Sequence, residues 1–335
     1  SIYQDHRRLI WMGSKTNGIY IATADGASDL TYSISHYSKS AAKDGLAGNQ
    51  IYSITADKYG NIWLGSFDGG LMKVVETAGG ISIIKDHVFL KNYPKTGFNK
   101  IRHLHFDRFG NLWIGTTDGL VIMYGNSNAA SPKFLTYRKL AAEEESLGDN
   151  GIQDIYEDSE NRIWLATSGG GVALARGESI KHLKFRNYTV KDGLANDFVL
   201  SMVEDDNGNL WFATENGLSK FNYTAGKFVN YNFYDGLPAA SFSEGPGAKD
   251  GQGNVYFGMS KGYLYFNPQN FYNNRIQGIL AFTNLQINNK NAGPETEDNH
   301  IEKDVNYLDK LVLNYNQNVL RLSCALLDYR FTDKE

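Results

Sequence analysis

The chain has 335 residues and a formal net charge of −4, with basic and acidic residues interspersed, which excludes the basic surface of a nucleic-acid-binding domain. Thirty-five glycines, only six prolines and 13% aromatic residues indicate an all-β fold with many tight turns. The single cysteine, Cys324, cannot form a disulfide within the chain, and no apolar run approaches the ~18–20 residues of a membrane span.

A turn-and-strand unit recurs along most of the chain. It reads DKYGNIWLGSFDGGLMKV from Asp57 and DRFGNLWIGTTDGLVIM from Asp107. Successive aromatic anchors lie 45 to 52 residues apart, and they are Trp11, Trp63, Trp113, Trp164, Trp211 and Tyr256. A period of this length is typical of a propeller. A β-solenoid is the alternative, but its coils are usually shorter and lack two separate tight turns.

Each repeat predicts four short strands. A strand ahead of the Asp (51–56, 101–106, 152–157 and 199–204) leads into an Asp-x-x-Gly hairpin, and the tryptophan strand follows. Because this strand is apolar on both faces, it is expected to be covered on both sides. A second Gly-containing turn leads to the third strand. Aromatic-rich pieces at 89–93, 133–140, 184–190 and 227–234 are expected to form the fourth strand of a propeller blade.

The two end repeats depart from the pattern. The first begins at its inner strand, and the sixth has SEGPGAKD where that strand is expected, with Pro246 opposing β structure. The sixth also lacks an obvious fourth strand. We therefore expect residues upstream of Ser1 to supply a further blade or closing strand, so that repeats one and six are not paired directly.

The sequence pattern changes at about Arg275, after the last turn-and-strand unit. Residues 278–290 predict a strand and a turn, and 311–331 predict two strands joined by a turn at 314–318. Leu320, Leu322, Cys324 and Leu326 alternate with other residues, which gives the last strand one apolar face. These few strands are too little for an independent sandwich. The expected domains are a propeller over residues 1–274 and part of a sandwich over 275–335.

The repeat GNIWLGSFDGGL resembles the two-component-regulator propeller repeat. The sixth unit, DGQGNVYFGMSKGYLYFNPQNF, is similar to that family's final repeat, and ILAFTNLQINNK…LNYNQNVLRLSCALLDYRFTDKE resembles the opening of the tyrosine-rich immunoglobulin-like domain that follows such propellers. The resemblance implies an all-β fold: six recognisable four-stranded blades of a seven-bladed β-propeller, followed by a partial immunoglobulin-like sandwich.

The resemblance also implies a function. Such regions are the periplasmic sensors of Bacteroides hybrid two-component systems, which detect polysaccharide-derived oligosaccharides and signal across the inner membrane. The expected partners are an oligosaccharide ligand and a second copy of the parent protein, with the membrane anchor and histidine kinase outside this chain. No cofactor and no catalytic residue are expected in this region.

Several residue groups have a simpler structural interpretation than a functional one. The tryptophans lie mid-strand between apolar residues, which indicates core rather than sugar-stacking platforms. His103 and His105 share one strand face, but no third ligand is visible, so a hydrogen-bonded pair lining the channel is favoured over a metal site. Residues 143–145, all glutamates, predict a solvated acidic loop.

The ligand site is expected on the rim where two sets of loops meet, because function concentrates on loops held by a rigid scaffold. These sets are the loops that lead into each blade, including Lys43, Asp44, Lys191 and Asp192, and the turns between second and third strands. The candidate ligand-binding residues are Phe67, Asp68, Phe98, Asn99, Asp118, Asn196, Asp197, Phe198, Glu215, Asn216, Tyr234 and Phe242. The aromatic members would stack on a pyranose face.

Two other functions remain open. Streptogramin-lyase-like propeller enzymes share a similar repeat, and a histidine and a carboxylate converging at the rim would favour such a lyase. A protein-interaction propeller would instead show an extended apolar rim patch.

Overall fold

The computed structural model describes residues 1–24, 31–40, 45–77, 80–85, 92–125, 132–238, 241–270, 279–297 and 299–327. The chain divides into two compact units, Ser1–Asn270 and Phe271–Glu335. The boundary expected at 274/275 falls within 271–278, outside the described residues.

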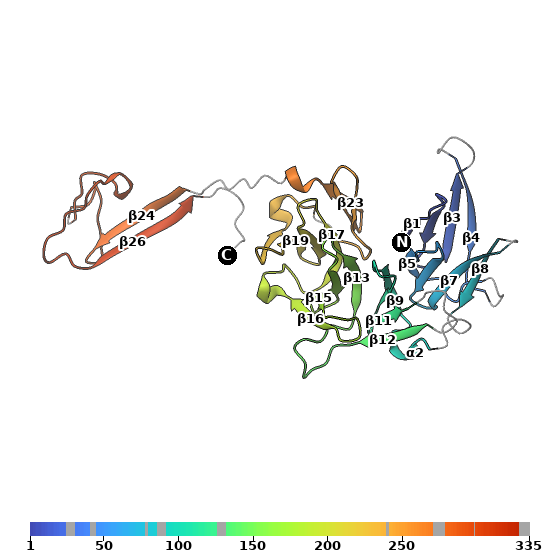
Figure 1. Cartoon of the computed structure of the whole chain (residues 1–335). Helices are drawn as coiled ribbons and strands as arrows, with labels where there is room; N and C mark the ends of the chain where they lie inside the picture. The colour runs from blue at the N-terminus through green and yellow to red at the C-terminus, as the bar shows by residue number, and fades with distance from the viewer. Residues whose placement is uncertain are drawn as a thin grey trace. The chain divides into compact units, whose positions relative to one another are not determined.

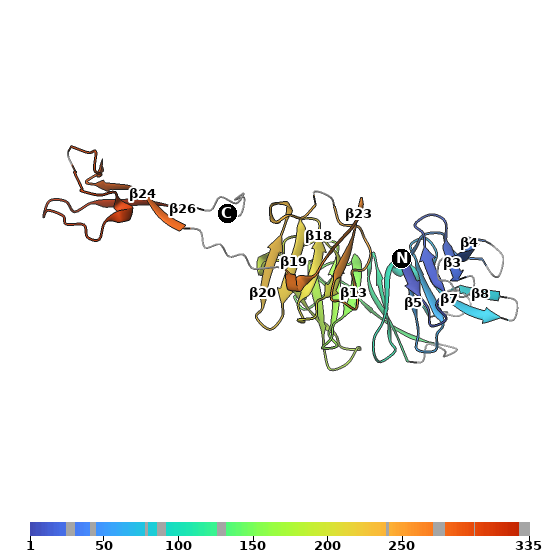
Figure 2. The same ribbon diagram turned by 90° about the horizontal axis from the view of Figure 1, so that it is seen from above.

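The first unit is a β-propeller whose antiparallel sheets follow one another in chain order (Figures 1 and 2). Five blades have four strands and the sixth has three, as the end-repeat pattern predicted. Blades 1 to 3 comprise β1 (Ile2–Gln4), β2 (Ile10–Gly13), β3 (Ile19–Ala24), β4 (Tyr32–Tyr37); β5 (Ile51–Ala56), β6 (Ile62–Ser66), β7 (Gly70–Thr77), β8 (Gly80–Lys85); and β9 (Ile101–Phe106), β10 (Leu112–Thr116), β11 (Gly119–Tyr124), β12 (Lys133–Tyr137). Blades 4 to 6 comprise β13 (Ile152–Glu157), β14 (Ile163–Thr167), β15 (Val172–Arg176), β16 (Lys184–Tyr188); β17 (Val199–Glu204), β18 (Leu210–Thr214), β19 (Gly217–Asn222), β20 (Lys227–Tyr231); and β21 (Ala248–Lys249), β22 (Val255–Met259), β23 (Gly262–Phe266).

One fourth strand differs from the prediction. In blade 2 it is β8, not residues 89–93, because the isoleucine-rich segment directly after β7 pairs with it as a hairpin. Tyr93 lies instead in the core, where its hydroxyl donates a hydrogen bond to the carbonyl oxygen of Phe98 at 2.7 Å. The one α-helical segment of the described residues is the four-residue α2 (Lys95–Phe98), in agreement with the expected all-β fold.

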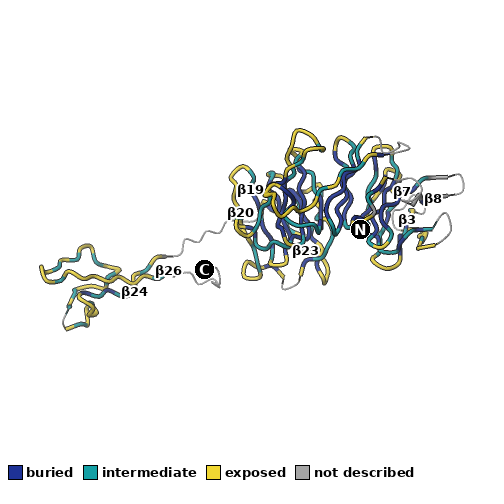
Figure 3. The backbone as a smooth tube through the Cα atoms, turned by 90° about the horizontal axis from the view of Figure 1, so that it is seen from below, coloured by how far each residue is buried: buried dark blue, intermediate teal, exposed yellow. Residues whose placement is uncertain are grey.

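The core lies between successive blades. Trp63 packs towards blade 3, with Ile101 and Ile114, whereas Ile62 and Leu64 pack towards blade 1. Figure 3 shows the interior of this unit in dark blue, as buried. All five tryptophans are at most 3% exposed. The predicted two-sided burial of the tryptophan strand is therefore confirmed.

The Asp-x-x-Gly turn also forms as predicted. In blade 2, Oδ1 of Asp57 accepts hydrogen bonds from the backbone N–H groups of Tyr59 and Asn61, and Gly60 has φ = 84°. Glycine adopts this left-handed conformation without a Cβ clash. Two repeats have another residue at the fourth position of this turn, Arg8 at φ = 67° and Asn161 at φ = 63°.

First strands of successive blades are neighbours and surround the central channel. Side chains join them: the Ser53 hydroxyl oxygen accepts a hydrogen bond from the N–H of Leu104, and Asp154 accepts one from the N–H of Met202. Among the described strands, none of blade 6 pairs with one of blade 1, in agreement with the sequence expectation. The number of blades in a complete ring stays a prediction.

The second unit contains one three-stranded sheet in the order β25–β24–β26, formed by β24 (Ile279–Ile287), β25 (Lys290–Asn291) and β26 (Leu320–Leu327). The strand predicted over 311–313 does not form, and these residues are exposed or half-buried. The turn predicted at 314–318 is present and is closed by the hydrogen bond from the N–H of Gln317 to the carbonyl of Asn314. Leu320 and Leu322 of the apolar β26 face are about half exposed.

Candidate ligand-binding site

The two sets of rim loops meet as expected from the topology. The N–H of Gly119, in the turn of blade 3, donates to the carbonyl of Asn150, in the loop leading into blade 4, at 2.7 Å. The N–H of Gly171 makes the equivalent bond to Asp197, one blade further, at 2.9 Å. We call this edge of the propeller the rim. Lys43 and Asp44 lie outside the described residues.

Three candidate carboxylates are engaged in the scaffold. Oδ1 and Oδ2 of Asp68 accept the N–H groups of Gln50 and Asn49. Burial alone would raise the pKa of Asp68, but hydrogen bonds from Gln50, Ser66 and Asn49 outweigh it and hold the pKa below its ordinary value. Asp118 accepts a hydrogen bond from the Arg138 guanidinium, and Asp197 accepts one from the N–H of Val190. The three aspartates therefore hold loops together.

Phe98 does not face a ligand. It is only 4% exposed and packs in the core between blades 2 and 3, with the Arg138 guanidinium 4.3 Å from its ring centroid. The prediction that it is a rim aromatic is wrong, because the turn 95–98 directs its ring inward against Tyr93. Its neighbour Asn99 is half-buried.

Asn196 and Phe198 shape the loop leading into blade 5. The Asn196 side-chain oxygen accepts the N–H of Phe198 at 2.7 Å, and Phe198 bridges to Ser168 of blade 4 through its backbone. The carbonyl of Phe198 accepts the N–H of Glu215 at 3.2 Å. Their observed contacts therefore position the turn that carries Glu215.

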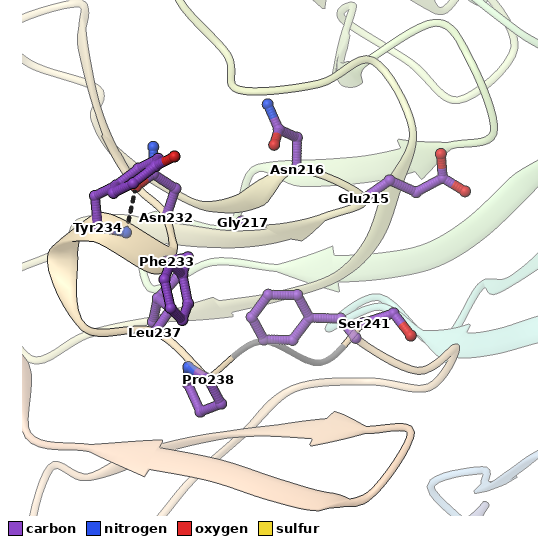
Figure 4. Close-up of a pocket in the computed structure, with 10 residues that line it drawn as sticks. Glu215, Asn216, Gly217, Asn232, Phe233, Tyr234, Leu237, Pro238 and Ser241 are labelled. Atoms are coloured by element: carbon purple, nitrogen blue, oxygen red, sulfur yellow. Dashed lines mark hydrogen bonds between the residues drawn. The ribbon is translucent and has the colours of Figure 1, made fainter. Parts of the chain in front are cut away.

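Of the remaining five candidates, Phe67 lies against Tyr52 of blade 2, with 5.4 Å between the ring centroids. The other four come together in one pocket between blades 5 and 6. Glu215 and Asn216 lie on the blade 5 turn, whereas Tyr234 and Phe242 belong to the segment leading into blade 6 (Figure 4). The pocket has a volume of about 390 Å³, within the ~300–1,000 Å³ of small-molecule sites. Its other lining residues are Gly217, Asn232, Phe233, Leu237, Pro238 and Ser241. We call this the blade 5–6 pocket.

A capped turn holds the aromatic wall of this pocket. Residues 232–236 read NFYDG: the Asn232 side chain accepts the N–H of Tyr234, and Asp235 accepts the N–H of Asn232. Gly236 ends the turn at φ = 93°. Because both ends of the turn are capped, Phe233 and Tyr234 are held outward and are 64% and 49% exposed.

Sequence reasoning missed Phe233. The equivalent loop of blade 5 reads TVKDG and forms the same capped turn, with Val190 and Lys191 in place of the two aromatic residues. Comparing the two loops position by position would have identified the aromatic pair as a feature of blade 6 alone.

The pocket combines three chemical features. Phe242, 8% exposed, and Leu237 give it an apolar floor. Phe233 and Tyr234 offer exposed ring faces. Among the described residues the exposed Glu215 carboxylate has no hydrogen-bond partner, so it is available as an acceptor, and the next residue, Asn216, also lines the pocket.

The two channel histidines each contact a carboxylate. His103 Nδ1 lies 3.1 Å from Asp154 Oδ1, and His105 Nε2 lies 3.4 Å from Glu157 Oε2. Burial lowers the pKa of His103 to about 3 and raises the pKa of Asp154 to about 7. The His103 imidazole is therefore neutral, and its contact with Asp154 is not an ion pair. In the described part of the chain no three His, Cys, Asp or Glu side chains are placed to hold a metal ion.

A family model described as "two component regulator propeller" matches residues 45–68, 97–118, 146–169 and 193–216. Each match runs from the loop leading into a blade to the turn after its second strand. A curated relative, "Histidine kinase P4" of Formosa agariphila, is 25% identical over 282 residues, covering 84% of this chain and 20% of the relative. The chain thus spans about one fifth of that relative.

Solved structures share the fold. Two structures of the extracellular domain of BT4673 from B. thetaiotaomicron, described as a one-component and as a hybrid two-component system, align with TM-scores of 0.54 and 0.51 at 18% and 17% identity. Both alignments cover 98% of this chain, and 59% and 60% of those chains. Virginiamycin B lyase from Staphylococcus aureus aligns with a TM-score of 0.54 at 14% identity, covering 81% of this chain and 84% of the lyase. None of the described helices is long and apolar enough to cross a membrane.

Proposed function

Because the chain carries two-component-regulator propeller repeats, we propose that it is part of the periplasmic sensor region of a hybrid two-component histidine kinase and binds a polysaccharide-derived oligosaccharide. The parent protein would be a homodimer anchored in the inner membrane by segments outside this chain. The single observation that carries the ligand proposal is the blade 5–6 pocket.

The chemistry of this pocket suits a sugar. The ring faces of Phe233 and Tyr234 match the apolar face of a pyranose, and the free carboxylate of Glu215 can accept hydrogen bonds from two hydroxyl groups. The side-chain amide of Asn216, which also lines the pocket, supplies both a donor and an acceptor. A site with few polar groups on an apolar wall selects by orientation rather than by charge alone.

Signalling would follow from differential affinity. A ligand shifts the equilibrium between two states of the parent kinase only as far as it binds one of them better. The rigid propeller would hold the site, and the unit that follows Asn270 would carry the change towards the membrane. No chemical conversion of the ligand is required.

Two alternatives make different demands on the site. A lyase would need a histidine near the substrate, but no histidine lines the blade 5–6 pocket, and His103 is buried in the channel. A protein-interaction propeller would need a broad apolar patch, and its test is binding that survives addition of competing saccharides.

Thermal unfolding with a panel of neutral and acidic oligosaccharides tests the proposal, because only a ligand that prefers the folded state raises the midpoint. For a saccharide that does so, Phe233→Ala is expected to lower the affinity about fivefold to tenfold, since a lost ring stack is worth about 1 kcal/mol. Val190→Ala, at the equivalent position of blade 5, is the matched control and should leave binding unchanged. Equal effects of the two substitutions would contradict the assignment of the pocket.

A further inference from the structure

The mouth of the central channel on the rim side gathers basic and aromatic side chains. Tyr52, Arg102 and Gln153 occupy the same position, second in the first strand, of blades 2, 3 and 4. Lys15 reaches the same opening from the turn of blade 1. We define the channel mouth as Lys15, Tyr52, Phe67, Lys100, Arg102 and Glu244.

Aromatic rings lie against the cations of the channel mouth. The Phe67 ring centroid lies 5.3 Å from Lys100 Nζ and 5.5 Å from Arg102 Cζ. Tyr52 and Phe67 are 5.4 Å apart between centroids, and Lys15 Nζ lies 5.2 Å from the Tyr52 ring. The cations are therefore held together over a continuous aromatic platform.

The carboxylate of Glu244 binds two of these cations. Glu244 Oε1 accepts a hydrogen bond from Arg102 Nη1 at 2.8 Å, and Oε2 accepts one from Lys15 Nζ at 3.1 Å. Burial alone would raise the pKa of Glu244, but hydrogen bonds from Arg102 and Lys15 outweigh it and keep the pKa below its ordinary value. A carboxylate at this point is thus ionised and held by residues of blades 1 and 3.

The channel mouth has more binding capacity than Glu244 uses. Lys15, Lys100 and Arg102 carry three positive charges against one carboxylate. Nε of Arg102 is buried and has no hydrogen-bond partner in the described residues, so one donor of this guanidinium is left unused by Glu244. Glu244 is 31% exposed and lies in an irregular segment next to Gly245 and Pro246. The Lys15 side chain is 61% exposed, so its ion pair with Glu244 contributes little to stability and a competing anion can displace it.

We propose that the channel mouth binds the carboxylate or sulfate group of an acidic oligosaccharide, and that Glu244 occupies this position until the ligand displaces it. The proposal deepens the proposed function, on which it rests, by naming an anionic glycan as the ligand class. The net charge of −4 gives no general attraction to such ligands, so the local cations have to supply it.

Isothermal titration calorimetry of residues 1–335 tests this with three probes: trigalacturonate, a sulfated carrageenan tetrasaccharide, and neutral galactotriose. Glu244→Gln is expected to raise the affinity for an acidic probe about fivefold to tenfold, because the internal competitor loses its charge. Arg102→Gln should lower that affinity by at least as much. The acidic probe whose affinity rises in Glu244→Gln shows whether the bound group is a carboxylate or a sulfate.

The matched control is Glu160→Gln, which removes the same charge from an exposed glutamate in the Asp158–Asn161 turn of blade 4. An equal gain in Glu160→Gln and Glu244→Gln, or an equal gain for galactotriose, would overturn the proposal. So would an acidic probe whose affinity depends on Phe233 and not on Arg102, since its charge would then lie in the blade 5–6 pocket. Galactotriose binding that is lost in Phe233→Ala tests the pocket by itself.

Discussion

Nε1 of Trp211 donates a hydrogen bond to Oδ2 of Asp205, six residues earlier, at 2.9 Å. The same bond recurs in the other tryptophan blades at 2.7 to 3.2 Å, from Trp11, Trp63, Trp113 and Trp164. In blade 6 the Tyr256 hydroxyl donates to Asp250 instead, at 2.8 Å. One carboxylate thus closes the hairpin turn and satisfies the buried indole N–H, which explains why the repeat keeps Asp and Trp at this spacing.

Asp205→Asn is expected to destabilise the propeller by about 1–3 kcal/mol, because the buried carboxylate accepts the N–H groups of Asn207, Asn209 and Trp211. Urea unfolding followed by tryptophan fluorescence measures this. The same change at Asp250, in the more exposed turn of blade 6, should cost clearly less. Equal losses at both sites would show that burial does not set the strength of this bond.

Trp113→Ala should cost about 3–5 kcal/mol of unfolding free energy, because the side chain is 3% exposed and packs between blades 3 and 4. Binding of an oligosaccharide to the rim, measured at a temperature where the variant is folded, should stay unchanged. A variant with wild-type stability and lost binding would mean that Trp113 is a ligand platform.

Arg8→Gly is expected to stabilise the protein by about 0.5–1 kcal/mol, because Arg8 takes the left-handed conformation that glycine adopts freely. Arg8→Ala removes the same side chain but keeps Cβ, so it should give no such gain. Thermal unfolding of the two variants separates backbone strain from side-chain loss. A gain shared by both would assign the effect to the arginine side chain.

Asp154→Asn is expected to change how stability depends on pH. The folded-state pKa of Asp154 is raised from 3.8 to about 7 by burial, so its contribution is fully present below pH ~4 and is lost as the pH rises through about 7. The stability of the wild type relative to Asp154→Asn should therefore fall between pH 4 and 7.

His103, whose pKa is lowered to about 3, has the opposite effect, since folding must exclude its proton below pH ~6.5. In the Asp154→Asn variant, the free energy of unfolding should therefore rise with pH between about 3 and 6.5. Urea titrations at pH 4, 5.5 and 7 test both slopes. A constant difference between wild type and variant would contradict the raised pKa of Asp154.

Much of the fold follows from local sequence. Asp57 and Gly60 define a hairpin through their own backbone preferences, and Trp63 between Ile62 and Leu64 requires cover on both faces. Such interactions act within about ten residues, so six copies of the pattern suffice to predict six blades. The errors at 89–93 and 311–313 arose where an apolar run had more than one possible strand partner.

The candidate site follows from the sequence only in part. Topology alone placed the right loops on one rim, and four predicted residues, Glu215, Asn216, Tyr234 and Phe242, line one pocket. For other candidates, packing was decisive. The Phe98 ring is buried, and the carboxylates of Asp68 and Asp118 accept hydrogen bonds from Gln50 and Arg138. Whether a side chain faces solvent or a neighbour depends on packing that no local pattern encodes.

The sequence by itself determined the repeating blade, because its turns and buried strands depend on residues close together in the chain. Only the tertiary structure brought Glu244 to Lys15, 229 residues away, and to Arg102 on a third blade. The circular arrangement of the blades makes distant first strands converge on one axis, and no spacing in the sequence marks which side chains meet there. The channel mouth is therefore a property of the assembled ring.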